Sequence, residues 1–306
     1  MRTLEIVHRT RYEYREPVTL GEHRLMFRPR DSHDLRLLST ALTIEPAAQV
    51  RYIHDPFGNS IAIATFAAPT RALEFVSTIR LEHYGFQPTL PSIEPYAWKL
   101  PFSYLAEEAP DLVRYVERHY PDPGAWVSSW ARQFLAAGDE TFEVLSRMSA
   151  AFPRDFTYSM RFESGIQPPA ETLKLRGGTC RDYALLMMEG ARALGLAARF
   201  VSGYLYDPAL DQAPGEASDT AWPHAWVEVY LPGAGWVEFD PTNGIAGTER
   251  LIRVAVGREP EQAMPIKGSF TGVPNACTNS IVEVTVRTVD FARNGNETAP
   301  VALSGP

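Results

Sequence analysis

Cysteine and histidine are the side chains of this 306-residue chain best suited to nucleophilic chemistry, and it holds two cysteines and seven histidines. A nucleophilic cysteine needs a base that takes its proton, and that base needs a third group that orients it. His224 is the one histidine that follows Cys180 along the chain, and Asp240 comes after His224. These three residue types together can support acyl transfer through a cysteine nucleophile.

Cys180 lies at the predicted start of a helix. Thr179 and Asp182 have the spacing of a capping box, which makes Thr179 the N-cap and Cys180 the first helical residue. The run "CRDYALLMMEGARAL" then continues to Gly195, a residue type that often ends helices. Unpaired N–H groups and the positive end of the helix dipole converge at the first residue and favour a thiolate. Asp182 is explained most simply as the capping carboxylate.

This helix has few polar residues, and Asp182, Glu189 and Arg192 form only a narrow stripe. We therefore expect the helix to be buried in the middle of a domain, with this stripe facing water. A cysteine on such a helix has a second explanation, because free cysteines often pack as inert apolar residues. The two glycines before Cys180 and its position at the helix start make the nucleophilic explanation equally good.

A β-hairpin is predicted around His224 and Asp240. Strict alternation from residue 224 places His224 and Trp226 on the face opposite the apolar one. The turn "PGAG" leads into a strand on which Trp236 and Asp240 share a face. If the hairpin closes at 230–234, His224 faces Asp240 directly, and if it closes at 231–235 the two are diagonal neighbours.

Both registers place His224 and Asp240 on the same face, within or near side-chain reach. A single histidine on a strand and an aspartate before a proline are also common structural residues. The pattern does not show that this hairpin contacts the helix of Cys180.

Composition excludes several classes of protein. The net charge of −8 and the absence of a basic cluster disfavour nucleic-acid binding. We find no segment typical of a signal peptide or a membrane span, and two cysteines cannot form a disulfide framework. We therefore expect a cytoplasmic protein without nucleic-acid or membrane partners.

The chain divides into two predicted domains, 1–95 and 96–306. The first contains short alternating β-rich runs separated by turn signals, which indicates an all-β, sandwich-like domain. A proline-rich segment, 85–110, is interpreted as a linker. Helical periods follow and then strands, including 250–257 and 280–291, so the second domain is predicted to be α+β.

The segments "GGTCRDYALLMMEGARALGLAARFVSGYL" and "HAWVEVYLPGAGWVEFDPTNG" resemble the core of transglutaminase-like cysteine enzymes, in which Cys, His and Asp occur in this order. "HRTRYEYREPV", "LMFRPR", "DPFGN" and "IRVAVGR" are similar to segments of the bacterial transglutaminase-like proteins. The resemblance implies a papain-like α+β domain preceded by an all-β, sandwich-like domain. It also implies that helix and hairpin meet, with Cys180 as nucleophile, His224 as general base and acid, and Asp240 as the orienting group.

The chain departs from this family at two places. After "VAVGR" the bacterial proteins usually continue with an aspartate–tyrosine stretch, whereas this chain has "EPEQAMP", so packing or loop geometry near the cleft is in question. The calcium-binding loops of the animal enzymes have no counterpart here, and no acidic cluster has calcium-loop spacing. We expect no metal and no other cofactor.

The resemblance implies attack on a peptide or side-chain amide of a peptide or protein substrate, through a thioester. The backbone N–H of Cys180 is the expected donor to the oxyanion, and Tyr158 and Trp222 are candidates for a second donor. Trp226 and Trp236 are expected to pack the hairpin rather than bind substrate.

Cys277 has no helix start and no partner histidine, so we expect it to be inert. Hydrolysis is favoured over amine transfer, because it requires no second binding site. Two other functions stay open: a catalytically silent binding module on the same fold, and a zinc site built from Cys180, His224 and Asp240. Structural zinc usually takes four ligands, and no fourth is evident.

Overall fold

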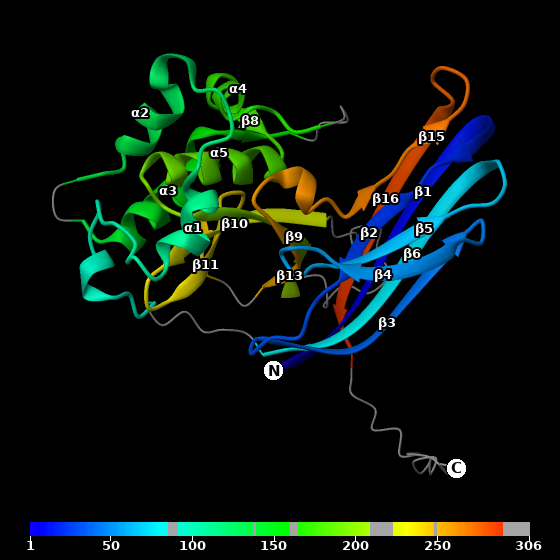
Figure 1. Ribbon diagram of the computed structural model, residues 1–306, viewed down its shortest axis with the longest axis horizontal. Helices are drawn as coiled ribbons and strands as arrows, with labels where there is room; N and C mark the ends of the chain where they lie inside the picture. The colour runs from blue at the N-terminus through cyan, green and yellow to red at the C-terminus, as the bar shows by residue number, and fades with distance from the viewer. Residues whose placement is uncertain (85–90, 137–138, 160–164, 209–222, 248–249, 290–306) are drawn as a thin grey trace, which may run out of the picture.

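The structure is a computed structural model that describes residues 1–84, 91–136, 139–159, 165–208, 223–247 and 250–289. Figure 1 shows two parts side by side, a β-rich part that contains the first strands and a part in which helices cover a second sheet. The predicted α+β domain with a preceding all-β domain is confirmed. No helix within the described ranges is long and apolar enough to cross a bilayer.

The β-rich part is a sandwich of two antiparallel sheets. One sheet contains β1 (Arg2–Leu20), β3 (Leu35–Glu45), β6 (Thr70–His83), β15 (Phe270–Thr271) and β16 (Cys277–Thr288). The other contains β2 (His23–Arg28), β4 (Gln49–His54), β5 (Ser60–Thr65) and β14 (Ile266–Lys267). Apolar side chains alternate along these strands, so one face of each sheet meets the other in a shared core that includes Leu25, Phe27, Leu73 and Phe75.

The last strand corrects the predicted division of the chain. β16 lies within the predicted second domain, 96–306, yet it pairs with β1 of the sandwich, with Val284 opposite His8 and Val282 opposite Thr10. β16 pairs with a strand from a distant part of the sequence, and local sequence patterns do not encode such a pairing. The chain therefore leaves the sandwich, builds the other part and returns to complete the first sheet.

The second part is built on the antiparallel sheet β12-β11-β10-β9-β13. Its strands are β9 (Ala198–Leu205), β10 (Pro223–Leu231), β11 (Gly235–Asp240), β12 (Ile245–Ala246) and β13 (Leu251–Gly257). Its helices are α1 (Ala109–Val116), α2 (Trp126–Arg132), α3 (Thr141–Asp155), α4 (Pro169–Leu175) and α5 (Cys180–Ala193). The remaining short elements are η1 (Pro95–Ala97), η2 (Pro123–Ala125), β7 (Thr157–Tyr158), β8 (Gly177–Gly178) and η4 (Pro260–Gln262).

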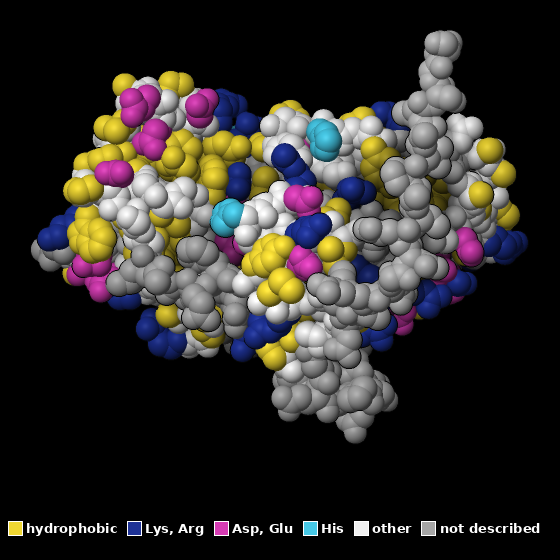
Figure 2. Space-filling model, turned by 90° about the horizontal axis from the view of Figure 1, so that it is seen from below, with side chains coloured by type: hydrophobic (Ala, Val, Ile, Leu, Met, Phe, Trp, Pro, Cys, Tyr) yellow, Lys and Arg dark blue, Asp and Glu magenta, His cyan; other side chains and the backbone are white. Residues whose placement is uncertain are grey.

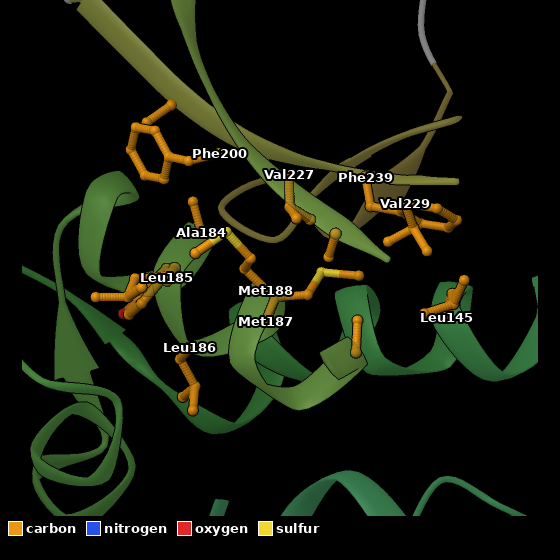
Figure 3. Close-up of a cluster of buried hydrophobic side chains, with 14 of the residues drawn as sticks. Leu145, Ala184, Leu185, Leu186, Met187, Met188, Phe200, Val227, Val229 and Phe239 are labelled. Carbon is orange, nitrogen blue, oxygen red and sulfur yellow. The ribbon is translucent and has the colours of Figure 1, made fainter. Parts of the chain in front are cut away.

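Both faces of this sheet are covered. Val227 and Phe239 point from the sheet toward Met188 of α5, as Figure 3 shows. On the other face, Tyr204 and Ile252 pack against the sandwich in a second apolar cluster. Burial on both sides explains why the polar residues of β10 are buried, although their alternation is typical of a strand with one face in water.

The proline-rich segment is packed rather than loose in its described part, 91–110. Ile93 and Ala97 are buried in the core of the second part, and the Glu94 N–H donates to the Pro232 carbonyl. The chain thus crosses between the two parts along the surface of the second part. On the described part of the face in Figure 2, acidic and basic side chains are interspersed.

Candidate active site

Cys180 is held at the first residue of α5 by a rigid helix cap. The Asp182 carboxylate accepts hydrogen bonds from the Thr179 N–H and from its hydroxyl, both at 2.9 Å. A Cβ at Gly178 would lie 2.9 Å from the Cβ of Asp182, so only glycine fits beside this cap. The thiol-bearing residue is 8% exposed, which leaves it buried but in contact with a cavity.

The polar residues of α5 do not lie where the sequence predicted them. Asp182, Glu189 and Arg192 are all buried, so the predicted water-facing stripe is wrong. Each is held by a partner instead: the Arg192 guanidinium lies 2.9 Å from Glu189 and 3.1 Å from Glu259. Buried charges are stable when paired and hydrogen-bonded, and Glu259 comes from a distant part of the sequence.

His224 and Asp240 form the expected hydrogen bond across the hairpin. Leu231 pairs with Gly235 and Val227 with Phe239, which is the register that closes at 231–235. The two residues are therefore diagonal neighbours, and Nε2 of His224 lies 2.8 Å from Oδ2 of Asp240.

Asp240 is fixed by the turn that follows it, a contact that the sequence analysis missed. The Asn243 amide donates to Oδ2 at 2.6 Å, and the Thr242 N–H donates to Oδ1 at 3.0 Å. The turn-forming sequence "DPTNG" was the available signal for these contacts.

The helix and the hairpin meet. His224 lies close enough to the Cys180 thiol to interact with it, and both residues line one cavity. Burial alone would lower the pKa of His224, but the interactions with Asp240 and Cys180 outweigh it and raise this pKa to about 10. Burial would raise the pKa of Asp240, yet its hydrogen bonds with His224 and Asn243 lower it. The pair therefore favours an imidazolium beside a carboxylate at neutral pH.

Tyr158 lies on β7 and precedes Cys180 in the sequence, whereas His224 and Asp240 follow it. β7 runs parallel to β8, with Tyr158 paired to Gly178, two residues before Cys180. The half-exposed Tyr158 hydroxyl lies close enough to Cys180 to interact with it, and partial burial and the Cys180 charge raise its pKa to about 12. Trp222, the other candidate donor, lies outside the described residues.

A cavity of about 600 Å³ opens beside these residues. Cys180, His224 and Tyr158 line it from the second part of the chain, while β1 and β16 line it from the sandwich. The segment 260–266, which follows β13, borders it as well and passes between the two parts in Figure 1. The "EPEQAMP" segment therefore shapes the cleft, and the sandwich forms a wall that the sequence pattern did not predict.

The facing wall is neutral at its centre. His8 of β1 is buried, with Nδ1 3.0 Å from the Tyr204 hydroxyl and Nε2 3.1 Å from the Thr10 hydroxyl. Burial lowers the pKa of His8 to about 4, so its imidazole is uncharged at neutral pH. Ile281 and Val282 of β16 continue this wall with apolar side chains.

The two tryptophans of the hairpin pack against neighbouring side chains. Trp226 is fully buried, lies over His224 with ring centroids 6.0 Å apart, and donates to Glu238 at 3.2 Å. Trp236 packs against the Arg199 guanidinium, 4.1 Å from its ring centroid. Cys277 is exposed on β16. Among the described residues, no group of three or more His, Cys, Asp or Glu could hold a metal ion.

Comparison with known proteins decides the family. Residues 4–82 match the bacterial transglutaminase-like N-terminal region, and residues 128–241 match the transglutaminase-like superfamily. An uncharacterized protein of Mycobacterium tuberculosis is 30% identical over 302 residues, which cover 94% of this chain and 92% of that protein. The chain belongs to the transglutaminase-like superfamily.

Two further proteins resemble this transglutaminase-like chain. A protein-glutamine gamma-glutamyltransferase of Pseudomonas aeruginosa is 39% identical over 74 residues, which cover 23% of this chain and 11% of that protein. A solved structure from Cytophaga hutchinsonii, described as a candidate cysteine protease, superimposes with a TM-score of 0.70 at 17% identity and covers 99% of this chain and 94% of its own. That structure shares the fold, and the superfamily supports a cysteine-dependent enzyme.

Proposed function

We propose that this chain is a cysteine-dependent acyl-transfer enzyme that cleaves peptide or side-chain amides through a thioester. The observation that carries the proposal is a thiol at a helix start that shares an open cavity with His224, which is hydrogen-bonded at 2.8 Å to Asp240. Nucleophile, base and orienting group in this geometry are what acyl transfer by cysteine requires.

In the first step the Cys180 thiolate attacks the carbonyl carbon of the amide. A C–S bond forms, and the carbonyl electrons move to oxygen, which becomes an oxyanion. The backbone N–H of Cys180 and the Tyr158 hydroxyl are the proposed donors to this oxyanion, since both lie at the thiol. Tyr158 suits this role because its raised pKa keeps the hydroxyl protonated.

In the second step the oxyanion collapses and the C–N bond breaks. The His224 imidazolium gives its proton to the leaving amine, while Asp240 holds the ring in place and offsets its charge. The product is a thioester on Cys180. Water then attacks the thioester with His224 as general base, and the carboxylic acid and the free thiol are released.

Hydrolysis is favoured over transfer to an amine, because water needs no binding site of its own. The Pseudomonas relative supports transfer as the second candidate, since its name describes a glutamyl transferase. The two are separated by supplying glutamine-containing peptides with and without a fluorescent primary amine.

We expect acid product that disappears in Cys180→Ala. More amine incorporation than acid, also lost in Cys180→Ala, would establish the transferase. Neither product would favour a silent binding module on this fold.

A further inference from the structure

Arg181 is a half-buried cation at the candidate active site, and no described carboxylate forms an ion pair with it. It follows Cys180 directly and lines the same cavity. It makes no hydrogen bond or ion pair with any residue in the described ranges. By contrast, Arg199 and Arg253 on the neighbouring strands are both held by the carboxylate of Glu228.

The described surroundings of Arg181 do not neutralise its charge. A cation in the first turn of a helix is electrostatically unfavourable, because the dipole there is positive. Asp182, the adjacent acid, has both carboxylate oxygens engaged, by the Gln167 N–H at 2.7 Å and by Thr179. No aspartate or glutamate is among the described residues that line the cavity.

Among the described residues, the opposite wall of the cavity also has no anionic side chain. Across the cavity stand neutral and apolar side chains of the sandwich, Thr10 and Tyr12 on β1 and Ile281 and Val282 on β16. An arginine presented to a cavity in this way matches a carboxylate ligand, because its planar guanidinium can donate two parallel hydrogen bonds.

We propose that the substrate carries a carboxylate close to the scissile amide and that Arg181 binds it. This inference rests on the proposed function and specifies its substrate class. Adjacent Cα atoms are about 3.8 Å apart and an extended peptide advances about 3.4 Å per residue. Because Arg181 is adjacent to Cys180 and lines the same cavity, we expect the bound carboxylate to lie within a few residues of the reacting carbonyl. An aspartate or glutamate side chain and a free C-terminal carboxylate share this chemistry.

The test alkylates Cys180 with paired reagents that differ in one charge. N-iodoacetylglycine and its amide probe an α-carboxylate, and the α-amides of N-iodoacetylglutamate and N-iodoacetylglutamine probe a side-chain carboxylate. In each case the thiolate displaces iodide, so that a C–S bond forms as the C–I bond breaks. The measured quantity is the ratio of anionic to neutral rate at Cys180, with exposed Cys277 as the internal reference.

We expect this ratio to be about tenfold higher at Cys180 than at Cys277 for one or both pairs. In Arg181→Gln it should fall to the Cys277 level, in Arg181→Glu below it, and in Arg132→Gln, an exposed arginine on α2, it should not change. The pair that responds identifies the source of the carboxylate.

A wild-type ratio equal to that of Cys277, or one that Arg181→Gln leaves unchanged, overturns the inference while neutral alkylation still supports the proposed function. If no reagent labels Cys180 faster than Cys277, the proposed function fails, and this inference fails with it.

Discussion

At the scale of the residue, the cysteine that we expect to react faster is the less exposed of the two. Cys180 is 8% exposed, whereas Cys277 is exposed on the edge of the sandwich sheet. If solvent access governed alkylation, Cys277 would react first. Cys180 instead lies at a helix start and beside His224, and we expect this position to make it the more reactive of the two.

Iodoacetamide near neutral pH should therefore label Cys180 at least about tenfold faster than Cys277 in the folded protein. Peptide mass mapping over time measures both rates in one sample, and unfolding in urea should make them equal. Faster labelling of Cys277 in the folded state would contradict the role of Cys180.

Asp240→Asn should lower the pKa of His224 toward its ordinary value near 6.5, because it removes the carboxylate that favours the imidazolium. The rate of amide cleavage should fall on the order of a hundredfold to ten-thousandfold. The alkaline limb of the pH–rate profile, set by loss of the imidazolium proton near pH 10, should move to lower pH. NMR titration of His224 measures the shift, and an unchanged pKa would argue against the pairing.

The pairing of His224 with Asp240 should also make the stability of the protein depend on pH. The folded-state pKa of His224 is raised to about 10, so its contribution to stability is full below about pH 6.5 and is lost as the pH rises through 10. Unfolding in urea between pH 6 and pH 10 should show this loss in the wild type and less of it in Asp240→Asn. Equal slopes with pH in both proteins would contradict the assignment.

At the scale of the element, the cap of α5 and the register of the hairpin position the site. The capping box and the first helical residue were predictable, because both depend on residues within one turn. The sequence predicted the hairpin but left two registers open. The structure has the register in which His224 and Asp240 are diagonal neighbours. The burial of the Glu189–Arg192 pair was not predictable, since Glu259, the second partner of Arg192, is far along the chain.

Asp182→Ala should cost about 1–3 kcal/mol of stability, because it leaves the Thr179 and Gln167 N–H groups without their acceptor. It should also slow alkylation of Cys180, since the helix start that presents the thiol loosens. Asp111→Ala, an exposed acid in the first turn of α1, is the matched control and should cost a few tenths of a kcal/mol. Urea unfolding and alkylation rates test both variants, and equal effects would count against the cap.

At the scale of the whole molecule, the cleft belongs to both parts. The second part supplies the reacting groups, and β1 and β16 supply the facing wall. Local patterns predicted strands at β1 and β16 but not this arrangement, because the pairing of β16 with β1 joins the two ends of the described chain. We therefore expect the sandwich to take part in substrate selection, because its side chains line the cavity.

Ile281→Ala should raise KM for an amide substrate severalfold while leaving the iodoacetamide rate of Cys180 unchanged, because it alters the wall and not the thiol. Val273→Ala is the matched control, since Val273 and Ile281 are each 39% exposed and only Ile281 lines the cavity. Steady-state kinetics on both variants measure the difference. A fall in kcat with unchanged KM would contradict a role in binding.

The return of the chain to β1 also sets an order of events during synthesis. The ribosome makes β1 first and the nucleophile, base and carboxylate later, but Cys277–Thr288 comes after all of them. A nascent chain that ends before Cys277 has its three reacting residues and only part of the wall that faces them. The binding surface is thus completed only when the last strand joins the first, and a prematurely terminated chain that folds its core still lacks the Ile281 side of its cleft.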